Sequence, residues 1–288
     1  MLDVLCLGEA LWDLYAPRGQ PFAQAAKLAL VPGGAAVNVA LHLTKLGLRA
    51  GLCAVVGDDA LGQALIARVA AAGVDCAQVS SAPPRTGLVF VERAGEARHV
   101  VGYRASDERA PLVPREIGAR ALFLTGVTPD AGQLAGFLQA ARRARRQRVT
   151  VVLDVNARPR RWVGRDASAL IPLLREADLL RCSTDDLAAL GLAIGTIEAS
   201  MRAKATLIVS DGAGVTRALG PFGRVERAPR AARVQDPTGA GDALTAGILA
   251  ALLEEGEGGD EPRSGASWAR AIDRGHALSR AHLTRRGR

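Results

Sequence analysis

Short apolar runs that suit buried strands alternate with helix-like segments along most of this chain. The strand-like runs are rich in Val, Leu and Ile and span residues 2–7, 50–56, 121–125, 149–154, 178–182 and 206–210. The helix-like segments between them span residues 35–46, 61–72, 131–145, 167–176 and 185–190. Strands that take turns with helices predict a mostly parallel sheet covered by helices on both faces. We therefore expect an α/β fold, built as one domain over residues 1–288.

Two segments interrupt this alternation. Residues 14–31 have no clear period and contain several prolines and glycines, which are typical of turns. Within residues 85–105, two short apolar runs at 87–92 and 99–103 flank a turn and predict a hairpin. Since no helix separates these strands, we expect the two segments to form a small β-sheet that serves as a lid.

A glycine-rich stretch near the C-terminus reads Asp-Pro-Thr-Gly-Ala-Gly-Asp-Ala at residues 236–243 and leads into an apolar helix. The amides of its Gly-Ala-Gly run would lie at the N-terminus of that helix, where unpaired N–H donors and the helix dipole favour an anion. Asp242 follows in the first turn and could accept a proton from an attacking hydroxyl. Small residues and an Asp are also ordinary helix caps, so this stretch alone leaves both interpretations open.

A second stretch reads Gly-Gly-Ala-Ala-Val-Asn-Val-Ala at residues 33–40. Its two glycines would let a ligand approach the backbone. Asn38 occupies the first turn of a helix that is apolar on nearly every side, so its amide needs partners, either in the protein or in a ligand. Other polar residues follow the predicted strands, where parallel sheets collect ligands. They are Asp13, Asp154, Asn156, Ser183, Ser210 and Asp211.

The composition of the chain and the absence of two nucleotide-binding motifs argue against several classes of function. The net charge is +8, but the arginines are scattered and aromatic residues make up only 3% of the chain, which argues against nucleic-acid binding. The chain has neither the GxxxxGKS/T pattern of P-loop kinases nor GxGxxG after its first strand. Apolar runs are shorter than the ~18 residues that span a membrane. We expect a small polyanion such as a nucleotide as partner, with no nucleic acid and no membrane.

The cysteines and histidines suggest no metal centre. Cys6 and Cys53 lie in strand-like apolar runs, and no CxxC spacing occurs, which predicts reduced core thiols in a cytoplasmic protein. The histidines show no paired ligand spacing, so each is expected at the surface or hydrogen-bonded in the core. They are His42, His99, His276 and His282.

With both glycine stretches considered, the chain resembles the ribokinase-like, or PfkB, family of carbohydrate kinases over nearly its whole length. Residues 8–13, Gly-Glu-Ala-Leu-Trp-Asp, and residues 154–162 look most like the fructokinase branch. The resemblance implies ATP-dependent phosphorylation of a primary hydroxyl of a sugar, with fructose or a similar ketose as the main expectation. It leaves 2-keto-3-deoxygluconate, a nucleoside, or sugar binding with weak catalysis as alternatives.

The resemblance also assigns roles to individual residues. Asp242 would be the catalytic base. The anion hole would be formed by the amides of Gly239, Ala240 and Gly241. Substrate would be bound by Asp13, Gly33, Gly34, Asn38, Tyr103, Arg104, Asn156 and Arg158. ATP would be bound by Ser183, Ser210, Gly212 and Gly214. Asp186 would hold Mg²⁺, and Asp236 and Thr238 match a loop that binds a monovalent cation, with K⁺ left open. A homodimer through the lid is expected.

Two departures from the family pattern are visible. The Asn-x-x-Glu motif that organises magnesium and phosphates reads Ser183-Thr184-Asp185-Asp186 here, a sequence that is also a common helix cap. The glycines after Ser210 are spaced one residue closer than usual. Both departures lie among the residues expected to bind ATP and Mg²⁺.

Overall fold

The computed structural model describes residues 1–83, 85–94, 97–103, 117–126, 131–157, 162–256 and 263–284. For residues 92–94 and 97–103 only the backbone is described. Within these ranges, none of the helices is both long enough and apolar enough to cross a lipid bilayer.

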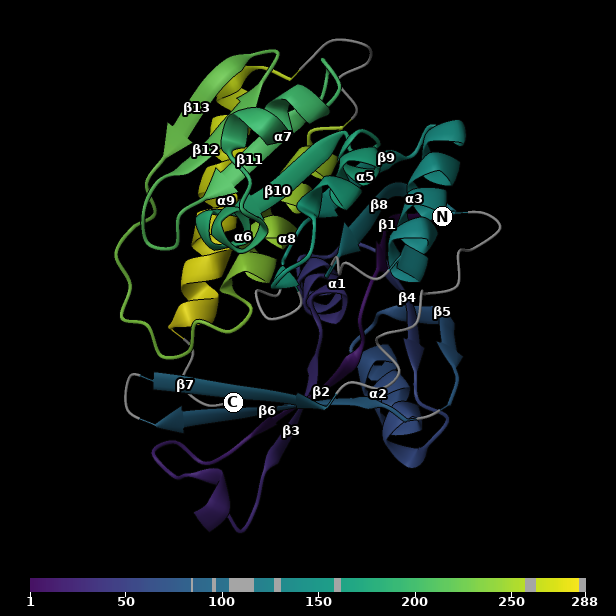
Figure 1. The fold of residues 1–288 in the computed structure, drawn as a ribbon, viewed down its shortest axis with the longest axis vertical. Helices are drawn as coiled ribbons and strands as arrows, with labels where there is room; N and C mark the ends of the chain where they lie inside the picture. The colour runs from purple at the N-terminus through teal and green to yellow at the C-terminus, as the bar shows by residue number, and fades with distance from the viewer. Residues whose placement is uncertain are drawn as a thin grey trace.

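A nine-stranded sheet forms the centre of the molecule (Figure 1). Its strand order is β13-β12-β11-β10-β9-β8-β1-β4-β5. The strands are β1 (Leu2–Leu7), β4 (Ala50–Val56), β5 (Asp75–Ser81), β8 (Ala119–Thr125), β9 (Thr150–Asp154), β10 (Leu179–Ser183), β11 (Thr206–Ser210), β12 (Thr216–Gly220) and β13 (Gly223–Arg227). Pairing is parallel from β5 through β11, whereas β12 and β13 are antiparallel. The predicted parallel sheet is confirmed.

Helices cover both faces of this sheet. One face packs against α1 (Ala35–Lys45), α2 (Ala60–Ala71), α8 (Ala240–Glu254) and α9 (Gly265–Leu283). The other packs against α3 (Ala131–Arg146), a 3-10 helix (Ala167–Leu170), α5 (Ile171–Leu174), α6 (Thr184–Leu190) and α7 (Ile194–Ser200). Along β1, Val4 and Cys6 belong to the first core, and Leu5 and Leu7 belong to the second. Two-sided burial explains why the strands read as continuous apolar runs.

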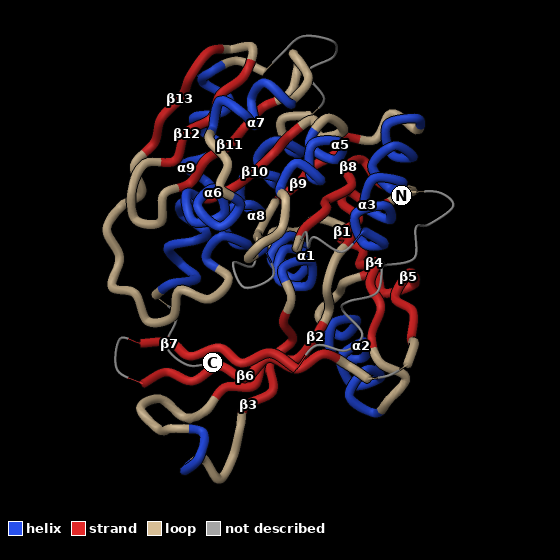
Figure 2. The backbone as a smooth tube through the Cα atoms, in the orientation of Figure 1, coloured by secondary structure: helices blue, strands red, loops and turns tan. Residues whose placement is uncertain are grey.

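A separate sheet of four strands has the order β3-β2-β6-β7. Its strands are β2 (Leu11–Tyr15), β3 (Ala29–Gly33), β6 (Gly87–Ala94) and β7 (Ala97–Tyr103), with a 3-10 helix (Phe22–Gln24) between β2 and β3. Figure 2 shows the strands of the two sheets as two distinct groups. The indole N–H of Trp12 donates to the carbonyl of Leu61 at 2.9 Å and ties β2 to α2. The predicted hairpin and the small sheet are both present.

Several elements differ from expectation. The helix expected over residues 167–176 is a 3-10 turn followed by the single turn α5, whose Pro172 lies at its start and lacks an amide donor. The edge strand β5, the short helix α7 and the long helix α9 were not predicted. In α9, charged and apolar residues are mixed, and its place is set by packing on α8. A Cβ atom on Gly247 would lie 2.7 Å from Cα of Gly275, so the two helices cross at close range.

Candidate active site

The N-terminus of α8 provides backbone donors for an anion. Gly239 is the N-cap and has φ of 80°, a left-handed conformation that suits glycine. The amide of Ala240 donates to the carbonyl of Pro237 at 3.2 Å. Among the residues that the structure describes, the amides of Gly239 and Gly241 donate to no acceptor. These two amides are therefore the available donors of the predicted anion hole.

Asp242 lies in the first turn of α8, and its residue is 8% exposed. Its Oδ2 accepts a hydrogen bond from Nδ2 of Asn38 at 2.8 Å. Asn38 lies on α1, so the bond joins the two glycine-rich stretches that the sequence singled out. The Asn38 amide thus has a protein partner for at least one of its donors, and this partner is the expected base.

The turn before α1 is sterically restricted to glycine. A Cβ atom on Gly33 would lie 2.6 Å from Cγ of Asp13, and one on Gly34 would overlap the carbonyl oxygen of Glu9. Gly34 also has φ of 96°. Asp13, on β2, is 7% exposed. The Asp13 carboxylate therefore rests directly against the Gly-Gly turn, and the absence of side chains there serves packing as well as ligand approach.

Arg181 lies beneath the first turn of α8 and was not predicted as a site residue. Its Nη1 donates to both carboxylate oxygens of Asp154, at 3.1 and 3.2 Å, and its Nη2 donates to Oγ of Ser210 at 2.7 Å. Oγ1 of Thr245 on α8 donates to the same Asp154 at 3.0 Å. A Cβ atom on Gly241 would lie 3.2 Å from both Nη atoms. The guanidinium thus occupies the space that this glycine leaves.

The charges in this network are tightly coupled. Burial raises the pKa of Asp154 to about 6; the Arg181 charge opposes that shift, and the carboxylates of Asp186 and Asp242 add to it. Burial by itself would lower the pKa of Arg181, but the neighbouring carboxylates, led by Asp154, raise it overall. Arg181 consequently remains a cation, held by the surrounding carboxylates under the amides of the predicted anion hole.

The residues predicted to bind ATP lie at the ends of β10 and β11. Ser183 caps α6, and Ser210 bonds Arg181 as described. Gly212 has φ of 50°, and a Cβ atom on Gly214 would lie 2.8 Å from Oδ2 of Asp211. The glycines therefore shape a tight turn after β11.

Asp186 forms a capping box with Ser183. One carboxylate oxygen accepts from the Ala157 amide at 2.7 Å. The other accepts from both the amide and the hydroxyl of Ser183, each at 2.7 Å. Within the described part of the chain, no cluster of three or more His, Cys, Asp or Glu side chains could hold a metal ion. The Mg²⁺ role of Asp186 stays a prediction, and any contact with Mg²⁺ would have to share these oxygens.

Asp236 and Thr238 form a tight turn before α8. Oδ1 of Asp236 accepts from the amide and the hydroxyl of Thr238, at 2.9 and 2.6 Å. Such turns are typical of Asp, whose carboxylate bonds the backbone two residues on. The carbonyl of Thr238 lies 2.6 Å from Nε2 of His282. The loop is therefore stabilised by hydrogen bonds between its own residues and by a hydrogen bond to α9.

Of the remaining predicted substrate residues, Asn156 is half-buried after β9 and has φ of 39°, which is unusual outside glycine. Arg104, Arg158 and the side chain of Tyr103 lie outside the described residues. Their placement relative to Asp242 is not part of the described structure, and their roles stay predictions.

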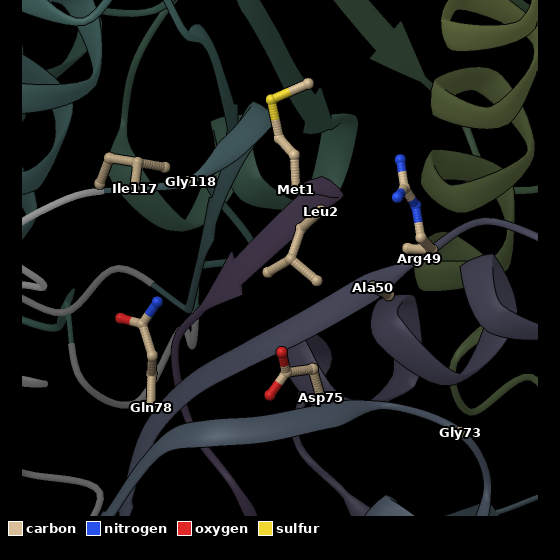
Figure 3. Close-up of a pocket in the computed structure, with 9 residues that line it drawn as sticks. All are labelled: Met1, Leu2, Arg49, Ala50, Gly73, Asp75, Gln78, Ile117 and Gly118. Atoms are coloured by element: carbon tan, nitrogen blue, oxygen red, sulfur yellow. The ribbon is translucent and has the colours of Figure 1, made fainter.

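Two cavities are lined by described residues of the chain. One of about 380 Å³ adjoins Asn38 between β3, α1 and α2. The other, of about 540 Å³, lies where β1 and β4 begin, at the opposite edge of the sheet from Asp242 (Figure 3). It is lined by Met1, Leu2, Arg49, Ala50, Gly73, Asp75, Gln78, Ile117 and Gly118. None of the predicted site residues lines the second cavity.

Comparison with known proteins yields consistent matches. The model of the family described as "pfkB family carbohydrate kinase" matches residues 1–288. A 2-dehydro-3-deoxygluconokinase from Thermoproteus tenax is 29% identical over 275 residues, which cover 89% of this chain and 83% of that protein. A 5-dehydro-2-deoxygluconokinase from Photobacterium profundum is 26% identical over 313 residues, covering 99% of this chain and 92% of that protein.

A solved structure of a fructokinase has a fold similar to that of this chain. The structure of a fructokinase with bound ATP from Xylella fastidiosa has a TM-score of 0.83 and 25% sequence identity to this chain. The match covers 99% of this chain and 93% of that chain.

Proposed function

The chain belongs to the pfkB family of carbohydrate kinases and has their ribokinase-like fold, and we propose that it phosphorylates a dehydro-deoxygluconate with Mg-ATP. The transferred group would be the γ-phosphoryl group, and the acceptor would be a primary hydroxyl of the sugar acid. The observation that carries this proposal is the pairing of Asp242 with Asn38 beside the amides of Gly239 and Gly241. It combines a base and an anion site at one helix terminus.

Each residue has a defined chemical task in this proposal. Asp242 takes the proton of the attacking hydroxyl, and Asn38 holds the carboxylate in place. The Gly239 and Gly241 amides stabilise charge on the phosphoryl group as it transfers. The Arg181 cation beneath them adds positive potential without leaving its partners. Mg²⁺ would arrive with ATP as part of that substrate and neutralise phosphate charge.

The proposed acceptor agrees with the names of the similar proteins and differs from fructose, the acceptor first expected from the sequence. The sequence motifs favoured fructose, whereas both curated relatives are dehydro-deoxygluconokinases, which supports the 2-keto-3-deoxygluconate alternative. A gluconate carries a carboxylate that a neutral ketose lacks. Arg104 and Arg158 remain predicted substrate residues, and a guanidinium is suited to bind a carboxylate.

An ADP-release assay over a panel of acceptors tests the proposal. The panel contains 2-dehydro-3-deoxygluconate, 5-dehydro-2-deoxygluconate, fructose and a set of nucleosides, each with Mg-ATP. We expect the highest kcat/KM with one of the two sugar acids. A higher value with fructose would favour the fructokinase alternative, which the ATP-bound fructokinase structure also supports. ADP release with none of the acceptors would favour a sugar-binding homologue.

We also retain the homodimer as a proposal. β3 is an edge strand of the small sheet, and the open edge of a sheet can pair with a strand of another chain. Light scattering of the purified protein would test it: a mass of one chain contradicts the proposal.

A further inference from the structure

The last turn of α9 holds the loop that precedes α8. Nε2 of His282 lies 2.6 Å from the carbonyl oxygen of Thr238. Because a carbonyl oxygen only accepts, Nε2 must carry the proton, which defines the ring tautomer. One residue further, the carbonyl of Leu283 accepts from the amide of Gln235 at 2.9 Å. Two consecutive residues of α9 therefore bond two points of this loop, at positions 235 and 238.

The His282 ring also touches the N-cap of α8. A Cβ atom on Gly239 would lie 3.4 Å from both Cε1 and Nε2 of His282. Gly239 has the left-handed φ of 80° that turns the loop into the helix. A shift of Thr238 would therefore be transmitted to the amides of Gly239 and Gly241, which are the donors of the proposed anion hole.

The ring of His42 packs against the ring of His282. The two ring centroids lie 5.2 Å apart with an interplanar angle of 63°, and both residues are buried, at 4% and 7% exposure. His42 lies one helical turn after Asn38 on α1. The same face of α1 thus contacts Asp242 through Asn38 and contacts the loop through the histidine pair.

We infer that His282 is a positioning residue for the anion hole, and that its N–H donates to the Thr238 carbonyl the hydrogen bond that takes the place of a monovalent cation at that oxygen. The inference rests on the proposed kinase function. It changes the expectation for Asp236 and Thr238: Oδ1 of Asp236 accepts from the amide and the hydroxyl of Thr238, and the carbonyl of Thr238 accepts from His282. The enzyme should therefore turn over without K⁺.

The first test compares kcat and KM in buffers that contain K⁺ or tetramethylammonium as the only monovalent cation. Wild-type kcat should agree between the two within about twofold. The His282→Ala variant should lose about 10- to 100-fold in kcat with similar KM values, since small displacements of catalytic groups cost this much. Added imidazole or K⁺ should restore part of the loss, and His282→Gln, which keeps an N–H donor, should retain more activity than His282→Ala.

His276→Ala is the matched control, because His276 lies on the same helix and bonds Thr216 instead of the loop. It should keep wild-type kcat. Wild-type kcat in His282→Ala, or a loss that neither imidazole nor K⁺ nor the glutamine variant reduces, would overturn the positioning role. A strict K⁺ requirement of the wild type would overturn the replacement of the cation.

A second readout does not depend on turnover. The chain has four histidines, so ¹⁵N-histidine labelling gives a simple imidazole spectrum in which His282 is assigned by its loss in His282→Gln. The inference requires a protonated Nε2 at His282 in the wild type, and a proton on Nδ1 alone contradicts it. If the wild type turns over none of the sugars, the proposed function fails, and this spectrum still decides the hydrogen bond to Thr238.

Discussion

Asn38 and Asp242, 204 positions apart in the sequence, are joined by a hydrogen bond of 2.8 Å from Nδ2 to Oδ2. The bond connects the first turns of α1 and α8, and each of these turns follows a glycine with positive φ, Gly34 and Gly239. The amide donor holds the Asp242 carboxylate in a fixed position at the start of α8. Variants of this pair therefore test the proposed chemistry.

Replacement of the proposed base should abolish most turnover. We expect Asp242→Asn to lower kcat by about 10²- to 10⁴-fold with little change in the sugar KM, because the amide cannot accept the proton. Asp75→Asn, an exposed acid at the start of β5, is the control and should behave as wild type. Steady-state ADP release measures both. Full activity in Asp242→Asn would exclude Asp242 as the base.

Removal of the buried cation should destabilise the protein. Arg181→Met leaves the fully buried Asp154 without its ion-pair partner, and such a loss costs about 3–5 kcal/mol. The double variant Arg181→Met with Asp154→Leu removes both charges and should recover much of that stability. Urea unfolding measures the free energies. A single variant as stable as wild type would show that the ion pair is dispensable.

The raised pKa of Asp154 predicts a pH dependence of stability. Its pKa is about 6 in the folded protein against 3.8 ordinarily, so between these values the folded state binds more protons than the unfolded state. This group therefore favours folding below about pH 4, and its contribution is lost as pH rises towards 6.

The pH effect is isolated by comparison with Asp154→Asn. Relative to that variant, wild type should lose about 2 kcal/mol of unfolding free energy between pH 4 and pH 6, because one pKa unit corresponds to about 1.4 kcal/mol. Chemical unfolding at a series of pH values gives the difference. Parallel curves for the two proteins would mean that Asp154 titrates normally.

Two glycine variants can separate the steric effect of a side chain at Gly34 from the cost of a left-handed backbone conformation. Gly34 and Gly47 have similar φ values, 96° and 86°, but a Cβ atom would overlap the Glu9 carbonyl at Gly34 and meet nothing within 4 Å at Gly47. Left-handed strain costs about 1–3 kcal/mol at either position. Gly34→Ala should exceed Gly47→Ala in destabilisation and should also raise the sugar KM. Equal losses would leave no steric role for Gly34.

Local patterns in the chain predicted most of the central strands and pointed to a candidate base. Two-sided burial makes each central strand a continuous apolar run, so β1, β4 and β11 could be predicted within a residue of their bounds. The Gly-Ala-Gly run predicts an open helix N-terminus, because backbone freedom and unpaired amides are properties of the residues themselves. Asp242 follows from its place in the first turn of that helix.

Contacts between distant segments required the tertiary structure. Arg181 could not be recognised as a site residue, because only the β9–β10 register places it beside Asp154 and only the position of α8 places Gly241 above it. Likewise His282 lies 44 positions after Thr238 with no spacing signal, and the crossing of α8 and α9 brings its ring to the loop. Residue type and local period determine secondary structure, whereas strand register and helix packing determine which buried polar groups meet.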